Sequence, residues 1–196
     1  MILTKIEKTR SGKVRIWLND EPAFLLYEKE CAEYRLSEGQ EVSGALYDEI
    51  CTAVLLKRAK MRCMHLLERM DRTEQQLRLK LKEGEYPEDV IDKALDAMKA
   101  AHYLDDLRYS ENYILANRDK KSARLLLMEL EQKGVERQTA QQALEEDPAD
   151  PCEVIRRLAE KKKFCPETAD EKETQRFYQF LLRKGFSFSD IKKTLT

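Results

Sequence analysis

Apolar side chains recur at an interval of about 50 residues from about residue 46 to the end of the chain. Taking Tyr86, Val135 and Phe186 as anchors gives spacings of 49 and then 51 residues. The positions nine and five residues before each anchor, and five and nine residues after it, are all apolar: Leu77, Leu126 and Phe177; Leu81, Leu130 and Leu181; Ile91, Ala140 and Ile191; Leu95, Leu144 and Leu195. A glycine lies beside every anchor (Gly84, Gly134 and Gly185). A fixed period of this length is typical of repeat proteins, and we therefore expect three tandem repeats.

The pattern inside one period predicts three helices. Thr73 and Ser122 share one register position ahead of their anchors, where a hydroxyl can cap the backbone N–H groups at the start of a helix. Thr73 to Gln76 also matches a reciprocal capping box. After the first anchor, apolar residues fall on the stripe of an amphipathic helix: Val90, Ile91, Ala94, Leu95 and Met98. A further helix should precede each capped one, at roughly residues 50–70, 105–118 and 151–163. Single repeats bury little, so they should stack into an elongated arc.

The N-terminal part of the chain follows a different pattern, in which the residue types alternate with a period of two. Ile2, Thr4, Ile6 and Lys8 alternate with Leu3, Lys5 and Glu7, which indicates a first strand. Residues 14–18 and 23–27 read as two more strands, separated by turn signals at Ser11-Gly12 and Asn19-Asp20-Glu21-Pro22. A sheet this small is only marginally stable alone, so it should pack on the helices. Beyond Leu36-Ser37-Glu38-Gly39, the pattern of apolar residues becomes typical of helices.

These patterns predict a mainly α protein with a small N-terminal antiparallel sheet and helix-turn-helix-like repeats. The expected domains are residues 1–45 (N-terminal β-hairpin region), 46–101 (repeat 1), 102–147 (repeat 2) and 148–196 (repeat 3). The segment Asp147-Pro148-Ala149-Asp150-Pro151 is the clearest hinge, because proline does not continue a helix.

Composition agrees with long helices and narrows the class. The 6 glycines and 5 prolines amount to about half the average share, which leaves few glycines for phosphate-binding loops. No apolar run approaches the ~20 residues of a membrane span, and the charged N-terminus lacks the apolar core of a secretory signal. The 5 cysteines are scattered with no CxxC pair, which favours a reduced, cytoplasmic protein without a zinc site, in which each cysteine packs as a small hydrophobe.

Two clusters could carry catalysis, and both have a simpler interpretation. Asp105 and Asp106 point about 100° apart on a helix, so they fit an N-cap and a first-turn anion better than an acid/base pair. Cys63 and His65 could be a nucleophile and its base, but no orienting acid is identifiable, and a structural histidine is the preferred interpretation. No nucleotide, metalloprotease or hydrolase motif occurs. The sequence therefore predicts no enzyme activity, no catalytic residue, no cofactor and no metal.

Charge is distributed in blocks, although 36 basic and 37 acidic side chains nearly cancel. Residues 57–82 hold nine basic side chains against three acidic ones, and residues 83–106 hold eight acidic against two basic. Arg69 and Arg118 share one register position in their repeats, and Arg72 and Lys121 share another, so stacked repeats would align them in a basic stripe. The candidate binding residues are Lys57, Arg58, Arg62, Arg69, Arg72, Arg78, Arg108, Arg118, Lys120, Lys121, Arg124, Arg156, Arg157 and Lys161.

This pattern leaves two interpretations open. The charges could be solvated helix faces, or they could meet a periodic negative surface such as a nucleic acid or a nucleoprotein filament. In the second case, the acidic stretch 83–106 would repel bare DNA or face a basic protein surface.

The residues also resemble a known family, the RecX regulatory proteins, which modulate the bacterial recombinase RecA. The specific run is Tyr103-Leu104-Asp105-Asp106-Leu107-Arg108-Tyr109-Ser110-Glu111-Asn112-Tyr113, similar to that family's Leu-Asp-Asp-x-Arg-aromatic-small signature. Residues 66–77, 129–135 and 177–187 are similar to its three repeat patterns. Two positions depart from them: Glu85 occupies the place of the family's glycine, with Gly84 one residue earlier, and Met70 follows Arg69 where a second basic residue is commoner.

The resemblance implies an arc of three-helix repeats that lies in the groove of the RecA–DNA filament. There it would restrain ATP hydrolysis, strand exchange and co-protease function, in DNA repair, recombination and the SOS response. It implies no catalytic residue or cofactor. We expect a monomer with weak or secondary direct DNA contact and no membrane contact.

Two other functions stay open. One is a stand-alone helix-turn-helix DNA-binding protein, with Arg78, Lys80 and Lys82 on its reading helix. A net charge of −1 and a pI of about 6.2 weigh against it. The other is a purely structural adaptor that binds proteins through its helical concavity.

Overall fold

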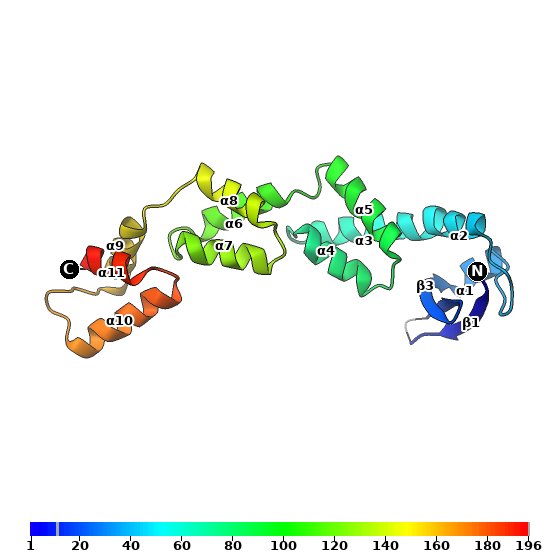
Figure 1. Cartoon of the computed structure of the whole chain (residues 1–196), viewed down its shortest axis with the longest axis horizontal. Coiled ribbons are helices and arrows are strands. Elements are labelled where there is room, and N and C mark those ends of the chain that lie inside the picture. Colours follow the sequence, from blue (N-terminus) through cyan, green and yellow to red (C-terminus); the bar gives the residue numbers. More distant parts are fainter. Residues whose placement is uncertain (11, 196) are drawn as a thin grey trace. The chain divides into compact units, whose positions relative to one another are not determined.

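The computed structural model describes residues 1–10 and 12–195, which form two compact units. The first unit is Met1–Leu104, and the second runs from Asp105 onward. Figure 1 shows a small sheet at the N-terminal end and helices in the rest of the chain, as predicted. Each unit is described in turn.

The N-terminal sheet has three antiparallel strands in the order β1-β2-β3. They are β1 (Leu3–Lys8), β2 (Lys13–Leu18) and β3 (Glu21–Tyr27). The second turn is shorter than predicted, because Glu21 and Pro22 already belong to β3. Asn19 and Asp20 form it alone with φ of 50° and 65°, the left-handed backbone that two-residue hairpin turns need. Pro22 is tolerated because β3 is an edge strand. The Ser11 half of the first predicted turn lies outside the described residues.

A short helix follows the sheet at a place where none was predicted. α1 (Glu28–Glu33) continues directly from β3, and the carboxylate of Glu30 accepts a hydrogen bond from the backbone N–H of Tyr27 at 2.7 Å. This contact satisfies one of the unpaired donors at the helix start. The first helix was expected only beyond Gly39, because a helix of this length is too short to show a periodic pattern.

One continuous helical segment then leads from the sheet into the first repeat. It consists of α2 (Gly44–Ile50), the π-helical stretch η1 (Cys51–Leu56) and α3 (Lys57–Leu67), and so begins earlier than the predicted residue 50. The Oγ atom of Ser43 caps its start. Residues four apart, such as Cys51, Leu55 and Ala59, are all buried on it. A step of four overshoots one turn of an α-helix, and the wider π turns absorb the overshoot.

Repeat 1 is completed by α4 (Glu74–Lys82) and α5 (Glu88–Ala100), which pack on α3. Thr73 caps α4, and Gln76 closes the predicted capping box. The buried side chains of this repeat belong to the same hydrophobic core as Phe24 and Leu26 of the sheet. The prediction that the sheet packs on the helices is therefore confirmed.

The second unit holds two more three-helix repeats. Repeat 2 contains α6 (Asp106–Asn117), α7 (Ala123–Gln132) and α8 (Arg137–Glu146); repeat 3 contains α9 (Pro151–Lys162), α10 (Glu171–Arg183) and α11 (Phe188–Leu195). Of the twelve apolar register positions, ten are buried, and Leu144 and Leu195 are half-buried. Ser122 caps α7 as predicted. Repeat 3 differs in that Asp170 starts α10 about one turn earlier than the register implies.

The turn after the second helix of each repeat holds the position at which Glu85 replaces the glycine of the RecX pattern. Gly134 and Gly185 precede their anchors with φ of 85°, and Glu85 takes the same left-handed region with φ of 56°. This conformation costs a side chain about 1–2 kcal/mol that glycine avoids. The Glu85 carboxylate forms a two-point ion pair with the Arg15 guanidinium of β2, with both N–O distances at 2.6 Å. The residue that replaces glycine therefore connects repeat 1 to the sheet.

Repeats 2 and 3 meet at the start of α7. The backbone N–H of Ser122 donates to the carbonyl of Lys184 at 2.9 Å, and Asp119 pairs with Arg157 at 2.7 Å. Gly185 lies so close that a Cβ atom there would be 2.7 Å from the Cβ of Leu125. Residues 147–150 of the predicted hinge (147–151) interrupt the helices between these repeats, whereas Pro151 already begins α9.

Candidate functional site

The paired aspartates at the start of α6 act in helix capping. The Oδ1 atom of Asp105 accepts a hydrogen bond from the backbone N–H of Arg108 at 3.0 Å, which identifies Asp105 as the N-cap. Asp106 lies in the first turn, where a negative charge complements the helix dipole. The capping interpretation is confirmed.

Cys63 and His65 do not form a nucleophile and its base. Cys63 is fully buried in the core, and burial raises the pKa of its thiol to about 11. The His65 side chain is 53% exposed, with its Nδ1 atom 3.9 Å from a carboxylate oxygen of Glu68. A neutral, enclosed thiol has little nucleophilic character.

The other four cysteines differ in their exposure. Cys31 and Cys51 are buried like Cys63, as expected, and Cys152 is half-buried. Cys165 is exposed, so the prediction of a buried cysteine is wrong there, because it lies in the loop between α9 and α10. No cluster of three or more His, Cys, Asp or Glu side chains that could hold a metal ion occurs within residues 1–10 and 12–195. In the same residues, no helix is long and apolar enough to cross a membrane.

Several predicted binding residues are held by acidic neighbours inside the protein. The ion pairs are Arg58 with Glu30, Arg78 with Asp92, Arg118 with Asp147, Lys121 with Glu129, and Arg157 with Asp119. These side chains order the fold, and their charge is partly neutralised before any partner arrives.

Lys121 shows this structural use most clearly. Its Nζ atom lies 2.6 Å from Glu129, and Tyr113 donates its hydroxyl to the same carboxylate at 2.8 Å. Burial alone would raise the pKa of Glu129, but the hydrogen bonds from Lys121 and Tyr113 bring it below its usual range. Lys133 adds a second cation over the Tyr113 ring, 5.2 Å from its centroid. Lys121 therefore stabilises repeat 2.

The basic and acidic blocks of repeat 1 pair with each other across the fold. Arg78 of α4 contacts Glu74, Glu88 and Asp92, and Lys82 contacts Glu88. Three carboxylates of the acidic stretch 83–106, those of Glu83, Glu88 and Asp92, therefore pair with the preceding basic block.

A smaller set of predicted residues stays exposed and makes no ion pair with any described residue. These are Lys57, Arg62, Arg69, Lys120, Arg124, Arg156 and Lys161. Outside this set, Arg108 is exposed, and Arg72 is half-buried with no hydrogen-bond partner for its Nε atom among the described residues. The set includes members from every repeat, and these charges are the ones available to an anionic partner.

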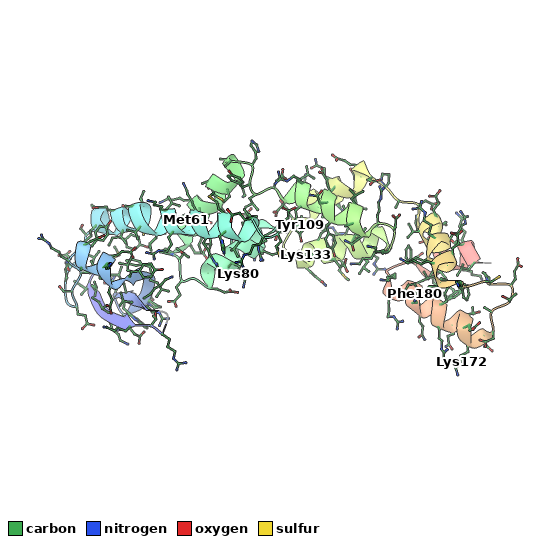
Figure 2. All side chains as sticks on the ribbon, turned by 180° about the vertical axis from the view of Figure 1, so that it is seen from behind. Met61, Lys80, Tyr109, Lys133, Lys172 and Phe180 are labelled. Carbon is green, nitrogen blue, oxygen red and sulfur yellow. The ribbon has the colours of Figure 1, made fainter. Side chains whose placement is uncertain are left out.

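A groove in the first unit collects basic side chains from the sheet and from repeat 1. Its volume is about 520 Å³, and it is lined by Lys13, Tyr27, Arg58, Met61, Arg62, His65, Lys80, Glu83, Gly84 and Tyr86. Met61 of α3 and Lys80 of α4 mark its position in Figure 2. Arg58, Arg62 and His65 follow each other at i, i+4 and i+7, so they share one face of α3. The sequence-based prediction missed Lys13 and Tyr27, because they lie on strands far from Arg62 in the sequence.

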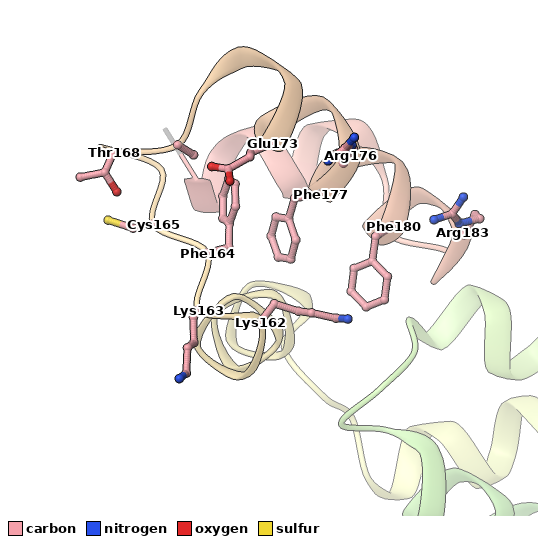
Figure 3. A pocket seen from close by; sticks show the side chains of 11 residues that line it. Lys162, Lys163, Phe164, Cys165, Thr168, Glu173, Arg176, Phe177, Phe180 and Arg183 are labelled. Carbon is pink, nitrogen blue, oxygen red and sulfur yellow. The ribbon is translucent and has the colours of Figure 1, made fainter.

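A pocket of about 410 Å³ in repeat 3 combines aromatic rings with cations. Figure 3 shows Phe164, Phe177 and Phe180 in a row facing the end of α9, with the Lys162 side chain running beside them. The Phe164 and Phe177 rings stack with centroids 4.2 Å apart, and Lys162 lies 5.3 Å from the Phe180 centroid. This arrangement was not predicted, because aromatic residues at helical spacing are typical of a core.

Comparison with known proteins places all three repeats in one family. Models of the first, second and third three-helix domains of RecX match residues 59–97, 105–144 and 149–195. The chain belongs to the RecX family. A regulatory protein RecX from Limosilactobacillus reuteri (strain DSM 20016) is 30% identical over 193 residues, covering 95% of this chain and 73% of the relative. One from Caldanaerobacter subterraneus subsp. tengcongensis is 29% identical over 199 residues, covering 100% and 98%.

Solved structures of RecX proteins have the same architecture. A crystal structure of regulatory protein RecX superimposes with a TM-score of 0.62 at 27% identity, covering 98% of both chains. RecX from Lactobacillus salivarius gives a TM-score of 0.57 at 21% identity over 71% of this chain and 94% of the other, which is a likeness of fold. The RecX resemblance seen in the sequence is therefore confirmed for the whole chain, the N-terminal sheet included.

Proposed function

We propose that this RecX protein is a non-enzymatic regulator that binds the RecA filament on DNA and restrains its ATP hydrolysis, strand exchange and co-protease function. The observation that carries the proposal is that each of the three RecX domains has exposed basic side chains without an ion pair to any described residue. A filament presents negative charge at regular intervals, and repeats that each carry such side chains can contact several intervals at once.

The alternative of a stand-alone helix-turn-helix reader is less well supported. A reading helix needs basic side chains that are available to base edges and phosphates. In α4, Arg78 contacts three carboxylates, Lys80 contacts Glu83 and Lys82 contacts Glu88. The helix that would enter the major groove is therefore largely neutralised by acidic side chains.

Recombinase assays with sub-stoichiometric protein test the proposal. Full-length protein is titrated into RecA on single-stranded DNA, and ATP hydrolysis and strand exchange are followed. We expect both rates to fall well before one protein per recombinase subunit is reached. An unchanged rate in both assays across the titration would overturn the proposal.

A charge-reduced variant separates binding from folding. Replacing Arg69, Arg124 and Arg156 by alanine removes one exposed charge from each repeat, and we expect loss of inhibition with an unchanged thermal unfolding midpoint. Lys29→Ala, an exposed charge on α1 outside the predicted set, is the matched control and should inhibit normally. A protein adaptor would keep full activity in the triple variant and show no salt dependence.

A further inference from the structure

The N-terminal sheet and repeat 1 form one body. They share a continuous hydrophobic core, and two arginines connect them across its edge. Arg15 of β2 pairs with Glu85 of repeat 1. Arg58 of α3 donates to the backbone carbonyl of Leu25 in β3 at 3.1 Å and pairs with Glu30 of α1 at 2.6 Å. The sheet is therefore held in a fixed position against α3.

This fixed position creates the groove described above, which neither part forms alone. Lys13 and Tyr27 come from the strands, whereas Arg58, Met61, Arg62 and His65 come from α3. The remaining wall is the end of α4 and the turn after it, where Glu85 holds its left-handed backbone. Glu85 lies between Gly84 and Tyr86 of this wall, so its ion pair with Arg15 of β2 lies next to the groove.

The charge of the groove is positive on balance. Lys13 and Arg62 make no ion pair with any described residue, and Lys13 lies 5.5 Å from the centroid of the Tyr27 ring. Glu83 is the single carboxylate among the described residues of the lining, and it pairs with Lys80 at 2.7 Å. The groove thus offers guanidinium, ammonium and phenol donors to an anion.

Two unpaired cations that come from separate elements of the groove suit a chain of phosphates better than a single small anion. Arg62 on α3 and Lys13 on β2 are the two cations of the groove without an ion pair to any described residue, because Arg58, one helical turn before Arg62, is already held by Glu30 and Lys80 by Glu83. Arginine and lysine side chains in a row follow a nucleic-acid backbone in sequence-independent binding, and tyrosine hydroxyls also contact phosphate and sugar.

We propose that this groove binds the phosphodiester backbone of a DNA strand, with the N-terminal sheet forming one wall of the binding surface. The inference deepens the proposed function, because it identifies the DNA of the filament as one of the two components contacted. It also gives the sheet a role in binding beyond covering the first repeat.

Direct binding of the full-length protein to a fluorescent single-stranded oligonucleotide, without recombinase, tests this assignment. The association constant is measured by anisotropy at a series of salt concentrations for the wild type, Lys13→Ala, Arg62→Ala and the double variant. Each lost phosphate contact lowers the slope of log K against log salt by about 0.9 for duplex DNA and about 0.7 for single strands. We expect a decrease of about 0.7 for each single variant and about 1.4 for the pair, with Lys29→Ala unchanged.

The outcomes distinguish this proposal from the proposed function. If the Lys13 and Arg62 variants keep the wild-type slope and affinity, the groove does not bind DNA, even where the protein still inhibits the recombinase. If Arg62→Ala alone lowers the slope, the sheet takes no part and the proposal is overturned. A far-ultraviolet circular dichroism spectrum of each variant confirms that the helices are intact.

Discussion

Gly185 is a position in the second unit at which a single added methyl group should be strongly destabilising. Its φ of 85° lies in the left-handed region, which costs an alanine about 1–2 kcal/mol. The added Cβ would lie 2.7 Å from the Cβ of Leu125 and closer still to the Oγ of Ser122. Ser122 caps α7 by accepting from the N–H of Leu125 at 3.2 Å, so moving it also removes a cap of about 1 kcal/mol.

Together these effects predict that Gly185→Ala lowers the free energy of unfolding by about 3 kcal/mol. Gly39→Ala is the matched control, because Gly39 has a similar φ of 81° with open space around it, and should lose about 1 kcal/mol from strain alone. Both are measured by urea unfolding followed by far-ultraviolet circular dichroism. Trp17 fluorescence, which reports on the first unit, should move little for Gly185→Ala.

A double variant isolates the steric part. Ser122→Gly removes the hydroxyl that the new Cβ would strike, and glycine at an N-cap costs only a few tenths of a kcal/mol. Gly185→Ala combined with Ser122→Gly should therefore be less destabilised than the sum of the two single changes. If Gly185→Ala is no more destabilising than Gly39→Ala, the close packing between repeats 2 and 3 does not contribute as described.

Three further outcomes are expected. Thr73→Ala removes a buried N-cap and should lower the free energy of unfolding by about 1 kcal/mol in the same urea experiment. In mildly alkaline buffer, iodoacetamide should modify exposed Cys165 and leave Cys63 unmodified in the folded protein, since burial raises the pKa of Cys63 to about 11; mass spectrometry locates the label. Arg15→Met should loosen the sheet at neutral pH, seen as an earlier Trp17 fluorescence transition. Because Arg15 lowers the pKa of Glu85, its contribution is complete above the usual glutamate pKa of about 4.3 and is lost as the pH falls through the lowered value, so wild type and variant should converge in acid.

The repeat architecture could be predicted because it depends on local information. Leu77, Leu81 and Ile91 repeat their spacing to the anchor three times, and caps such as Thr73 act within one helical turn. Short, non-periodic elements give no such signal, which is why α1 was missed. The strand that begins at Glu21 was shortened in the prediction because Pro22 is typical of a turn unless the strand is known to be at an edge.

The binding surface was less predictable because it depends on contacts between distant residues. Arg58 and Arg62 look alike in the sequence, but only Arg58 meets Glu30, which belongs to the separate helix α1. Arg118 is likewise paired with Asp147, which lies 29 residues further along the chain. Ion pairs at such separations follow from the fold, so a list of basic residues overstates the charge available to a partner.

The π-helical stretch between α2 and α3 has a consequence for chain length. In an ordinary α-helix, removing one residue rotates everything beyond it by about 100°, which would turn the buried face of α3 toward solvent. In the π-helical stretch Cys51–Leu56, each backbone hydrogen bond spans one residue more than in an α-helix. Deleting one residue would therefore let this stretch form ordinary α-helical hydrogen bonds, and the helices on both sides would keep the same faces toward the core. Relatives one residue shorter at this point can therefore keep the same sheet, the same first repeat and the same orientation between them.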